Sequence, residues 1–412
     1  MKTKDSFQVA GLALALLALF NLPPSACGQG ALTPSGPPAP TMKTLAQIEP
    51  RTAIASLPYT INAPGSYYVT TNLAGVAGQP GISISAGGVT LDLMGFELVG
   101  GPGTDAGIMA LGGNNIVVRN GTVRGWGNGG VNLFAGEHNS LERVRAMQNT
   151  GIGLGGVGSM TDCRAYSNTV HGLANLGAGV VRGCVAQNNG GDGISSTGPV
   201  RESHATGNAG RGILSGSSVL DSVAEYNGLA GIAVEAGGLV HKCAARLNTK
   251  IGISGELGSQ IQDCTVSSSG TTGIVVTARG TVRDCTLFGN GGPGIVAGIG
   301  STVRGNTVRQ SGGDGILVPN DCHVLENHCT QNGGAGIRVT IAGNRIEGNN
   351  VVINQQGIWL QGSANVVVRN TARWNPGSGS IGSSNYVGTA GNDVGPIGSA
   401  ATATSPWANI SF

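Results

Sequence analysis

Aromatic and charged residues are both scarce in this sequence of 412 residues. Aromatic side chains make up 4% and charged side chains 11% of the chain, whereas glycine occurs 74 times. So few large side chains argue against an ordinary layered globular core. The glycines lack the strict triplet period of collagen, and ample Ile, Val and Leu argue against disorder. The chain must therefore bury small aliphatic residues in a regular way.

Clustered positive charge and repeated long apolar runs are also missing. The formal charge is +2 with no Lys/Arg cluster, which argues against a nucleic-acid partner. The one long apolar run, Val9–Leu22, follows Lys2 and Lys4 and precedes small residues up to Gly28. This arrangement predicts a signal peptide over residues 1–28, because the run is shorter than the roughly 20 residues of a membrane span. We therefore expect a secreted or periplasmic protein without a membrane span.

Two further features belong to this N-terminal part. A lipoprotein acylated at Cys27 is the alternative, which Pro24 disfavours at a position where such signals usually carry Leu. Residues 29–49 are rich in proline and predict an extended linker.

Seven cysteines remain after Cys27, and an odd number in a large exported protein is not a disulfide framework. We expect them to be unpaired thiols.

A glycine followed by an aliphatic residue recurs along most of the chain, mainly in steps of 21 residues. A fixed period near 20 indicates a solenoid of stacked coils. Gly and β-branched residues fill the repeat interiors, which excludes helical repeats. The spacing predicts about fourteen coils of about 21 residues, which start at Gly81, Gly107, Gly130, Gly151, Gly172, Gly193, Gly212, Gly231, Gly252, Gly273, Gly294, Gly315, Gly336 and Gly357.

Alignment of the coils on the next glycine exposes ladders of like residues, which should stack at the interstrand spacing of about 4.8 Å. The apolar ladders should fill a narrow core. Nine residues before each glycine stand Cys163, Cys184, Ser203, Ser222, Cys243, Cys264, Cys285, Asn306 and Asn327. Four residues before it stand Asn168, Asn189, Asn208, Asn227, Asn248, Ser269, Asn290, Ser311 and Asn332.

Each ladder has a structural and a functional interpretation. The cysteine ladder lies between two inward apolar slots, so we interpret it as a row of small buried hydrophobes rather than a metal or redox site. The asparagine ladder should satisfy backbone groups at a turn through side-chain amides that bond to the next coil. The alternative, a binding face, is less favoured.

Both ends of the repeat carry more specific motifs. Within residues 50–99 these are PRTAIASLPYTINAPGSYYVTTNL and GISISAGGVTLDLMGFEL, and the C-terminal motifs are GNDVGPIG and SPWANISF. They resemble secreted bacterial right-handed parallel β-helix repeat proteins of the pectate-lyase-like superfamily. Met94 departs from the family's Asp-Leu-Asn-Gly turn, where Asn would stand. The resemblance implies an all-β right-handed parallel β-helix with three parallel sheets over residues 81–377, an N-terminal cap over 50–80 and a C-terminal capping segment over 378–412.

Candidate chemistry requires polar side chains in the same outward slot of adjacent coils. Glu235 and Glu256 both come four residues after a repeat glycine. Two carboxylates about 5 Å apart could share a Ca²⁺ ion or act as nucleophile and acid of a retaining glycosidase. The alternative is a pair of solvated charges. No other cofactor is expected.

A second candidate catalytic group is His171, Asp192 and Arg211, each directly before a repeat glycine in consecutive coils. A histidine beside a carboxylate could transfer protons near neutral pH. The alternative is a turn position that accepts any residue, because Ala230 and Ile251 continue the series.

The candidate ligand site is Arg338 beside Trp359, with Gln361 nearby. An aromatic ring next to a guanidinium suits stacking on a sugar and hydrogen bonding to its hydroxyls. The alternative is packing under the C-terminal segment.

The signatures of pectate lyases, polygalacturonases and mannuronan epimerases are missing from the sequence. The family resemblance implies an exported protein that binds or acts on an extracellular polysaccharide or cell-surface glycan, and whether it is an enzyme stays open. The alternative is a non-catalytic structural or adhesive rod at the cell surface.

Overall fold

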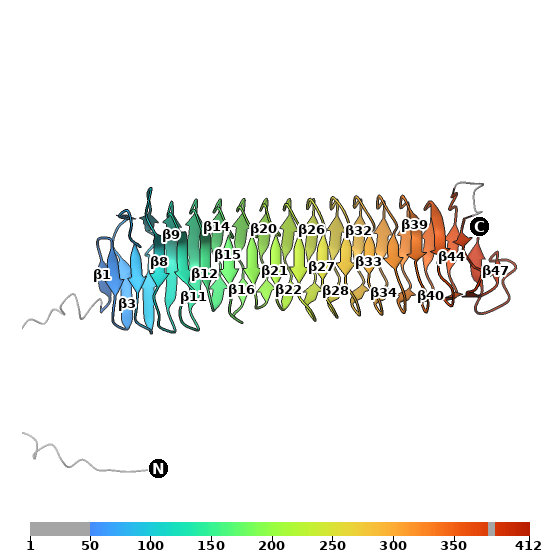
Figure 1. Cartoon of the computed structure of the whole chain (residues 1–412), viewed down its shortest axis with the longest axis horizontal. Helices are drawn as coiled ribbons and strands as arrows, with labels where there is room; N and C mark the ends of the chain where they lie inside the picture. Colours follow the sequence, from blue (N-terminus) through green and yellow to red (C-terminus); the bar gives the residue numbers. More distant parts are fainter. Residues whose placement is uncertain (1–49, 378–383) are drawn as a thin grey trace, which may run out of the picture. The chain divides into compact units, whose positions relative to one another are not determined.

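The computed structural model describes residues 50–377 and 384–412. The expected signal peptide, linker and first residues of the C-terminal capping segment lie outside the described residues. Residues 51–412 form one compact unit. Within the described parts all regular structure is β-strand and every strand pair is parallel, in about 15 turns. Figure 1 shows these coils stacked side by side from β1 to β44. The prediction of a parallel β-helix is confirmed.

One sheet contains 16 strands, one from each coil. Fourteen of them follow the repeat glycines, and one further strand stands at each end. The strands are β2 (Tyr59–Ile61), β5 (Ile82–Ile84), β8 (Ala106–Ala110), β10 (Gly129–Leu133), β12 (Ile152–Gly156), β15 (Leu173–Asn175), β18 (Ile194–Ser196), β21 (Ile213–Ser215), β24 (Ile232–Val234), β27 (Ile253–Gly255), β30 (Ile274–Val276), β33 (Ile295–Ala297), β36 (Ile316–Val318), β39 (Ala335–Val339), β42 (Gln356–Leu360) and β45 (Tyr386–Val387).

The other sheet has 32 strands and forms two faces of the coil. The faces are joined because β9 (Val117–Arg124) and β11 (Ser140–Met147) run through both. The first face also contains β1 (Thr52–Ile54), β3 (Gly65–Val69), β6 (Val89–Asp92), β13 (Ser159–Thr161), β16 (Val181–Arg182), β19 (Val200–Arg201), β22 (Ser218–Leu220), β25 (Leu239–His241), β28 (Gln260–Gln262), β31 (Thr281–Arg283), β34 (Thr302–Arg304), β37 (His323–Leu325), β40 (Arg345–Glu347), β43 (Val366–Val368) and β46 (Asp393–Val394).

The second face of this sheet continues to the C-terminus. The three sheets that the sequence predicts are thus present as three faces of the coil, two of which share β9 and β11. The second face contains β4 (Leu73–Ala74), β7 (Glu97–Val99), β14 (Arg164–Tyr166), β17 (Val185–Gln187), β20 (His204–Thr206), β23 (Val223–Glu225), β26 (Ala244–Arg246), β29 (Thr265–Ser267), β32 (Thr286–Phe288), β35 (Thr307–Arg309), β38 (His328–Thr330), β41 (Asn350–Val352), β44 (Thr371–Arg373), β47 (Ile397–Gly398) and β48 (Asn409–Ser411).

Single left-handed residues turn the chain at two corners of each coil. Asp162 has φ 53° and Ser167 has φ 52°. The residue after each of them, Cys163 or Asn168, is buried. This geometry places the cysteine ladder inside the coil, as the sequence predicts. All seven cysteines of the described residues are free, so they pack as small hydrophobes.

The asparagine ladder bonds neighbouring coils to each other. The Asn189 Oδ1 atom accepts from the Asn168 backbone N–H at 3.1 Å and from Asn168 Nδ2 at 3.0 Å. Asn168 Nδ2 also donates to the Ala146 carbonyl at 3.2 Å. Polar atoms that would be costly inside the coil are thus paired, and the predicted turn role is confirmed.

The repeat glycine is required by the same ladder. A Cβ atom on Gly172 would lie 2.6 Å from the Gly193 carbonyl oxygen and 2.7 Å from Asn189 Nδ2. Any larger residue would push the coils apart. The glycine period therefore marks the corner where the 16-stranded sheet begins.

Candidate functional site

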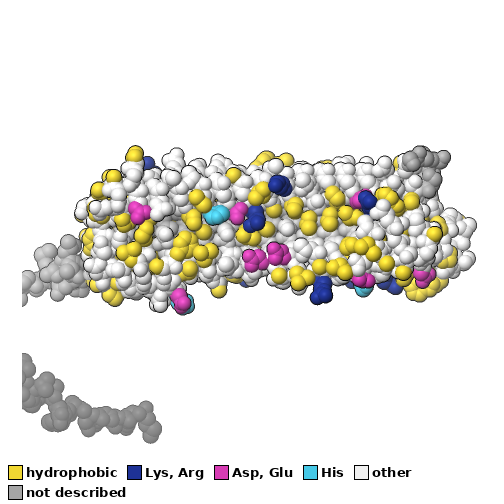
Figure 2. All heavy atoms as spheres, in the orientation of Figure 1, with side chains coloured by type: hydrophobic (Ala, Val, Ile, Leu, Met, Phe, Trp, Pro, Cys, Tyr) yellow, Lys and Arg dark blue, Asp and Glu magenta, His cyan; other side chains and the backbone are white. Residues whose placement is uncertain are grey.

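The outer face of the 16-stranded sheet carries a continuous row of in-register side chains. Most of the row is small or aliphatic, and its charged and aromatic members, Arg338 and Trp359, stand near the C-terminal end of the sheet. In chain order the row is Leu214, Ala233, Ser254, Val275, Val296, Leu317, Arg338 and Trp359. Figure 2 shows one face of the molecule, on which charged side chains are few, with one group near the middle and others scattered toward both ends.

A shallow groove of about 360 Å³, called the central groove below, lies at the start of this row beside Leu214, Ala233 and Ser254, near the middle of the 16-stranded sheet. Its lining includes Glu235 and Glu256 from the ends of β24 and β27, together with Arg211 and Lys250. Because β24 and β27 pair in register, the two glutamates lie in adjacent coils, as the sequence predicts. The structure also brings Arg211, from the other candidate group, to the same groove.

Glu235 and Glu256 border the same groove and are both exposed to solvent. Exposed carboxylates can accept hydrogen bonds from a ligand that lies in the groove.

The groove fits a calcium ion poorly. Ca²⁺ takes six to eight oxygen ligands, and cationic Lys250 and Arg211 line the same groove. Among residues 50–377 and 384–412, no three His, Cys, Asp or Glu side chains converge on a common point. Ca²⁺ binding at Glu235 and Glu256 stays a prediction from the sequence alone.

His171, Asp192 and Arg211 lie in a row at one edge of the sheet, but their contacts differ from a catalytic dyad. His171 Nδ1 accepts from the Asp192 backbone N–H at 3.0 Å. The Asp192 carboxylate instead accepts from the Arg211 backbone N–H at 2.7 Å and lies 3.7 Å from Arg211 Nη1. The imidazole is thus tied to the main chain rather than to a carboxylate, and the row links consecutive turns.

Arg338, Trp359 and Gln361 come together at the C-terminal end of the same face. The Arg338 Cζ atom lies 4.5 Å from the centroid of the Trp359 ring. Arg338 Nε donates to Gln361 Oε1 at 3.1 Å, and Arg338 Nη1 lies 3.6 Å from Asp314 Oδ2. Trp359 is half-buried, so part of the indole is open to solvent. The three predicted residues form one cluster, and Asp314 is a fourth member that the sequence reasoning missed.

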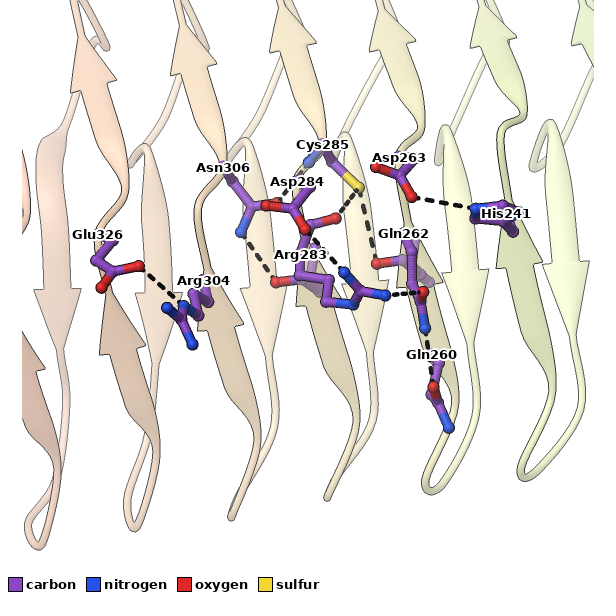
Figure 3. Close-up of polar contacts among 12 residues, drawn as sticks. His241, Gln260, Gln262, Asp263, Arg283, Asp284, Cys285, Arg304, Asn306 and Glu326 are labelled. Carbon is purple, nitrogen blue, oxygen red and sulfur yellow. Dashed lines mark hydrogen bonds and ion pairs between the residues drawn. The ribbon is translucent and has the colours of Figure 1, made fainter.

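The large sheet carries a second polar row that the sequence reasoning also missed. His241 Nε2 lies 3.1 Å from Asp263 Oδ2, and Arg304 Nε lies 2.9 Å from Glu326 Oε2 (Figure 3). Between these pairs, Arg283 contacts the side chain of Gln262 (Figure 3). His204 and Glu225 pair in the same way at 3.1 Å on the other face. The missed signal is a spacing of 21 or 22 residues, one period of the repeat, between a basic side chain and an acidic or amide side chain.

The comparisons with known proteins agree with the architecture. Residues 296–389 match the family model for the right-handed β-helix region. The chain folds as a right-handed parallel β-helix. No curated protein matches the sequence. No helix of the described residues is long and apolar enough to cross a membrane.

Several solved structures are similar at low identity. The A-module of the mannuronan C-5 epimerase AlgE6 of Azotobacter vinelandii is 16% identical, with a TM-score of 0.44, 74% of this chain and 90% of that chain covered. The Dettilon tailspike protein is 14% identical, with a TM-score of 0.39 and coverage of 78% and 63%. The periplasmic alginate epimerase AlgG is 14% identical, with a TM-score of 0.36 and coverage of 79% and 77%. Likeness at this level assigns no role to any residue of this chain.

Proposed function

We propose that this protein is an exported protein that binds an extended polysaccharide along the outer face of the 16-stranded sheet. The observation that carries the proposal is the cluster of Arg338, Trp359 and Gln361. Arg338 is fixed above the indole by contacts with Gln361 and Asp314. A sugar is bound by an apolar surface together with a few well-placed polar groups, and this cluster supplies both.

The cluster has hydrogen-bonding capacity to spare. A guanidinium carries five N–H donors, and the contacts to Gln361 and Asp314 use only part of them. Gln361 uses its Oε1 atom toward Arg338 and is exposed, so its amide N–H groups face solvent. These donors can bond sugar hydroxyls without any rearrangement of the cluster.

The central groove supplies a second set of polar contacts on the same face. Its glutamates can accept hydrogen bonds and its Arg211 and Lys250 can donate them. Four coil steps separate β27, at the groove, from β39, which carries Arg338. At about 4.8 Å per step the two positions are roughly 19 Å apart along the sheet. A short stretch of one polysaccharide chain can reach both.

The test is binding of the purified protein to a panel of acidic and neutral polysaccharides, followed by Trp359→Ala on the ligand that binds. A central aromatic residue typically contributes at least 2 kcal/mol, so affinity should fall about thirtyfold. Trp374→Ala is the matched control, because Trp374 is 49% exposed on the large sheet. If Trp359→Ala lowers the melting temperature and leaves affinity unchanged, Trp359 is a packing residue. That result would favour the alternative of a non-catalytic structural or adhesive rod.

A further inference from the structure

A separate groove of about 400 Å³ lies on the large sheet near the C-terminus. Its floor comes from three neighbouring strands, β40, β43 and β46, and its wall comes from the segment that follows them. From the sequence, this segment is expected only to cap the end of the helix.

The floor of the groove is apolar in its middle and polar at both ends. Arg345, Val366 and Asp393 lie side by side in register on the three strands. Val368 lies beside Val366 in β43 and also lines the groove. The two valines therefore form a small flat apolar surface between a guanidinium and a carboxylate.

Trp407 forms the wall and is held in place from one side. The Arg369 Cζ atom lies 4.2 Å from the centroid of the Trp407 ring. Arg369 is itself fixed, because its Nε donates to the Pro406 carbonyl at 3.1 Å and its Nη1 lies 3.0 Å from Glu347 Oε1. Trp407 is nevertheless 47% exposed and lines the groove. Arg369 covers one side of the indole and fixes its position, so the exposed part of the ring is available to a ligand.

The charges around the groove balance. Glu347 accepts from Arg345 Nε at 2.7 Å as well as from Arg369. The Asp393 carboxylate is exposed and makes no ion pair or side-chain hydrogen bond in the described residues. Two cations and two carboxylates give no net charge, and the carboxylate without a partner faces the ligand. This arrangement would repel an anionic sugar and accept hydrogen bonds from hydroxyl groups.

We propose that this groove binds a neutral sugar residue, with the ring against Val366, Val368 and Trp407 and its hydroxyl groups on Asp393 and Arg345. Aromatic and aliphatic walls with a few polar groups are what such a ligand requires. The ligand class rests on the proposed glycan-binding function, but the groove lies on a different sheet from Trp359 and is tested separately.

The experiment is calorimetric titration of the full chain with neutral oligosaccharides and with acidic oligosaccharides of equal length. Trp407→Ala should lower the affinity of the groove for the neutral ligand about thirtyfold, and Asp393→Ala should lower it by a smaller factor. Trp407→Phe should restore most of the binding, and an unchanged melting temperature for each variant confirms that the fold is intact. Binding of the acidic ligand should not change with Trp407→Ala.

The outcomes separate the two proposals. If Trp407→Ala changes neither affinity nor stoichiometry, or if the acidic ligand loses affinity as much as the neutral one, the inference is wrong. If Trp407→Ala removes one binding event and Trp359→Ala removes none, the groove is confirmed and the proposed site on the 16-stranded sheet fails. If Trp359→Ala removes binding and Trp407→Ala does not, the site on the 16-stranded sheet is confirmed and the proposed groove at Trp407 fails.

Discussion

At the residue scale, the corner asparagines do most to define the coil, and the places where they are replaced are informative. Ser269 and Ser311 replace asparagine in two coils of the ladder, one on each side of Asn290. Their Oγ atoms, together with Asn290 Nδ2, are buried without a hydrogen-bond partner in the described residues. A serine side chain is too short to reach the next coil, so both it and the adjacent asparagine lose contacts.

Ser269→Asn should therefore stabilise the protein. The new amide would accept from Asn248 and donate toward Asn290, as Asn189 does in a regular coil. We expect the free energy of unfolding to rise by about 1 kcal/mol, measured by urea denaturation. Ser267→Asn, in β29, is the control and should change stability by less than about 0.5 kcal/mol. A loss of stability with Ser269→Asn would show that the corner lacks room for the amide.

Asp92 gives a second residue-scale prediction. Burial raises its pKa, but the Met94 N–H, the Asn120 amide and the Arg119 guanidinium outweigh burial and hold the pKa below its usual value. A lowered folded pKa means that the unfolded chain binds more protons in acid. The stabilisation from Asp92 is therefore full above about pH 4 and is lost as the pH falls through the folded pKa.

Asp92→Asn tests whether the ionised Asp92 carboxylate stabilises the folded protein. At pH 7 the variant should be less stable than the natural protein by about 2 kcal/mol, because it loses charge-assisted hydrogen bonds. The gap should narrow as the pH falls below about 4. Urea denaturation of both proteins at several pH values measures it. A gap that is constant with pH would contradict the charged state of Asp92.

At the scale of the element, fourteen strands of the 16-stranded sheet have a repeat glycine at their start because the coils approach too closely there for a side chain. Gly172→Ala places a methyl group 2.6 Å from a neighbouring carbonyl oxygen. We expect a loss of about 1–3 kcal/mol in the free energy of unfolding. Gly101→Ala is the matched control, because a Cβ atom there would meet nothing within 4 Å. Equal effects of the two variants would contradict the steric account.

The elements also show how far the sequence predicts the fold. A side chain in the repeat either faces inward or outward, so the period alone places ladders such as Val181, Val200 and Val219 in the core. The first coils are longer and irregular, and there the prediction has no ladder to use. Trp126 is fully buried and donates to the Leu98 carbonyl at 3.0 Å. Only packing against several glycines makes room for it.

The candidate site is less predictable than the core for a physical reason. Register places Arg338 beside Trp359, and the structure confirms that neighbourhood. Long polar side chains, however, choose partners by rotamer, so the pairing of Arg338 with Asp314 cannot be derived from the period. The groove at Trp407 depends on how the chain folds back after the last repeat, which no repeat position encodes.

At the scale of the whole molecule, the proposed function requires one face of the helix to bind a polysaccharide lengthwise. The central groove and the cluster at Arg338 lie on the same sheet, roughly 19 Å apart. A chain that reaches both should bind more tightly than one that reaches either, because the second contact becomes intramolecular.

The most direct measurement is the dissociation constant for a series of oligosaccharides of increasing length, prepared from the polysaccharide that binds. Affinity should rise steeply until the ligand spans about 20–25 Å and should then level off. Glu235→Gln together with Glu256→Gln, or Trp359→Ala alone, should remove the rise and leave short ligands bound at the intact position. An affinity that does not depend on length, or a rise that survives these substitutions, would contradict binding along this face.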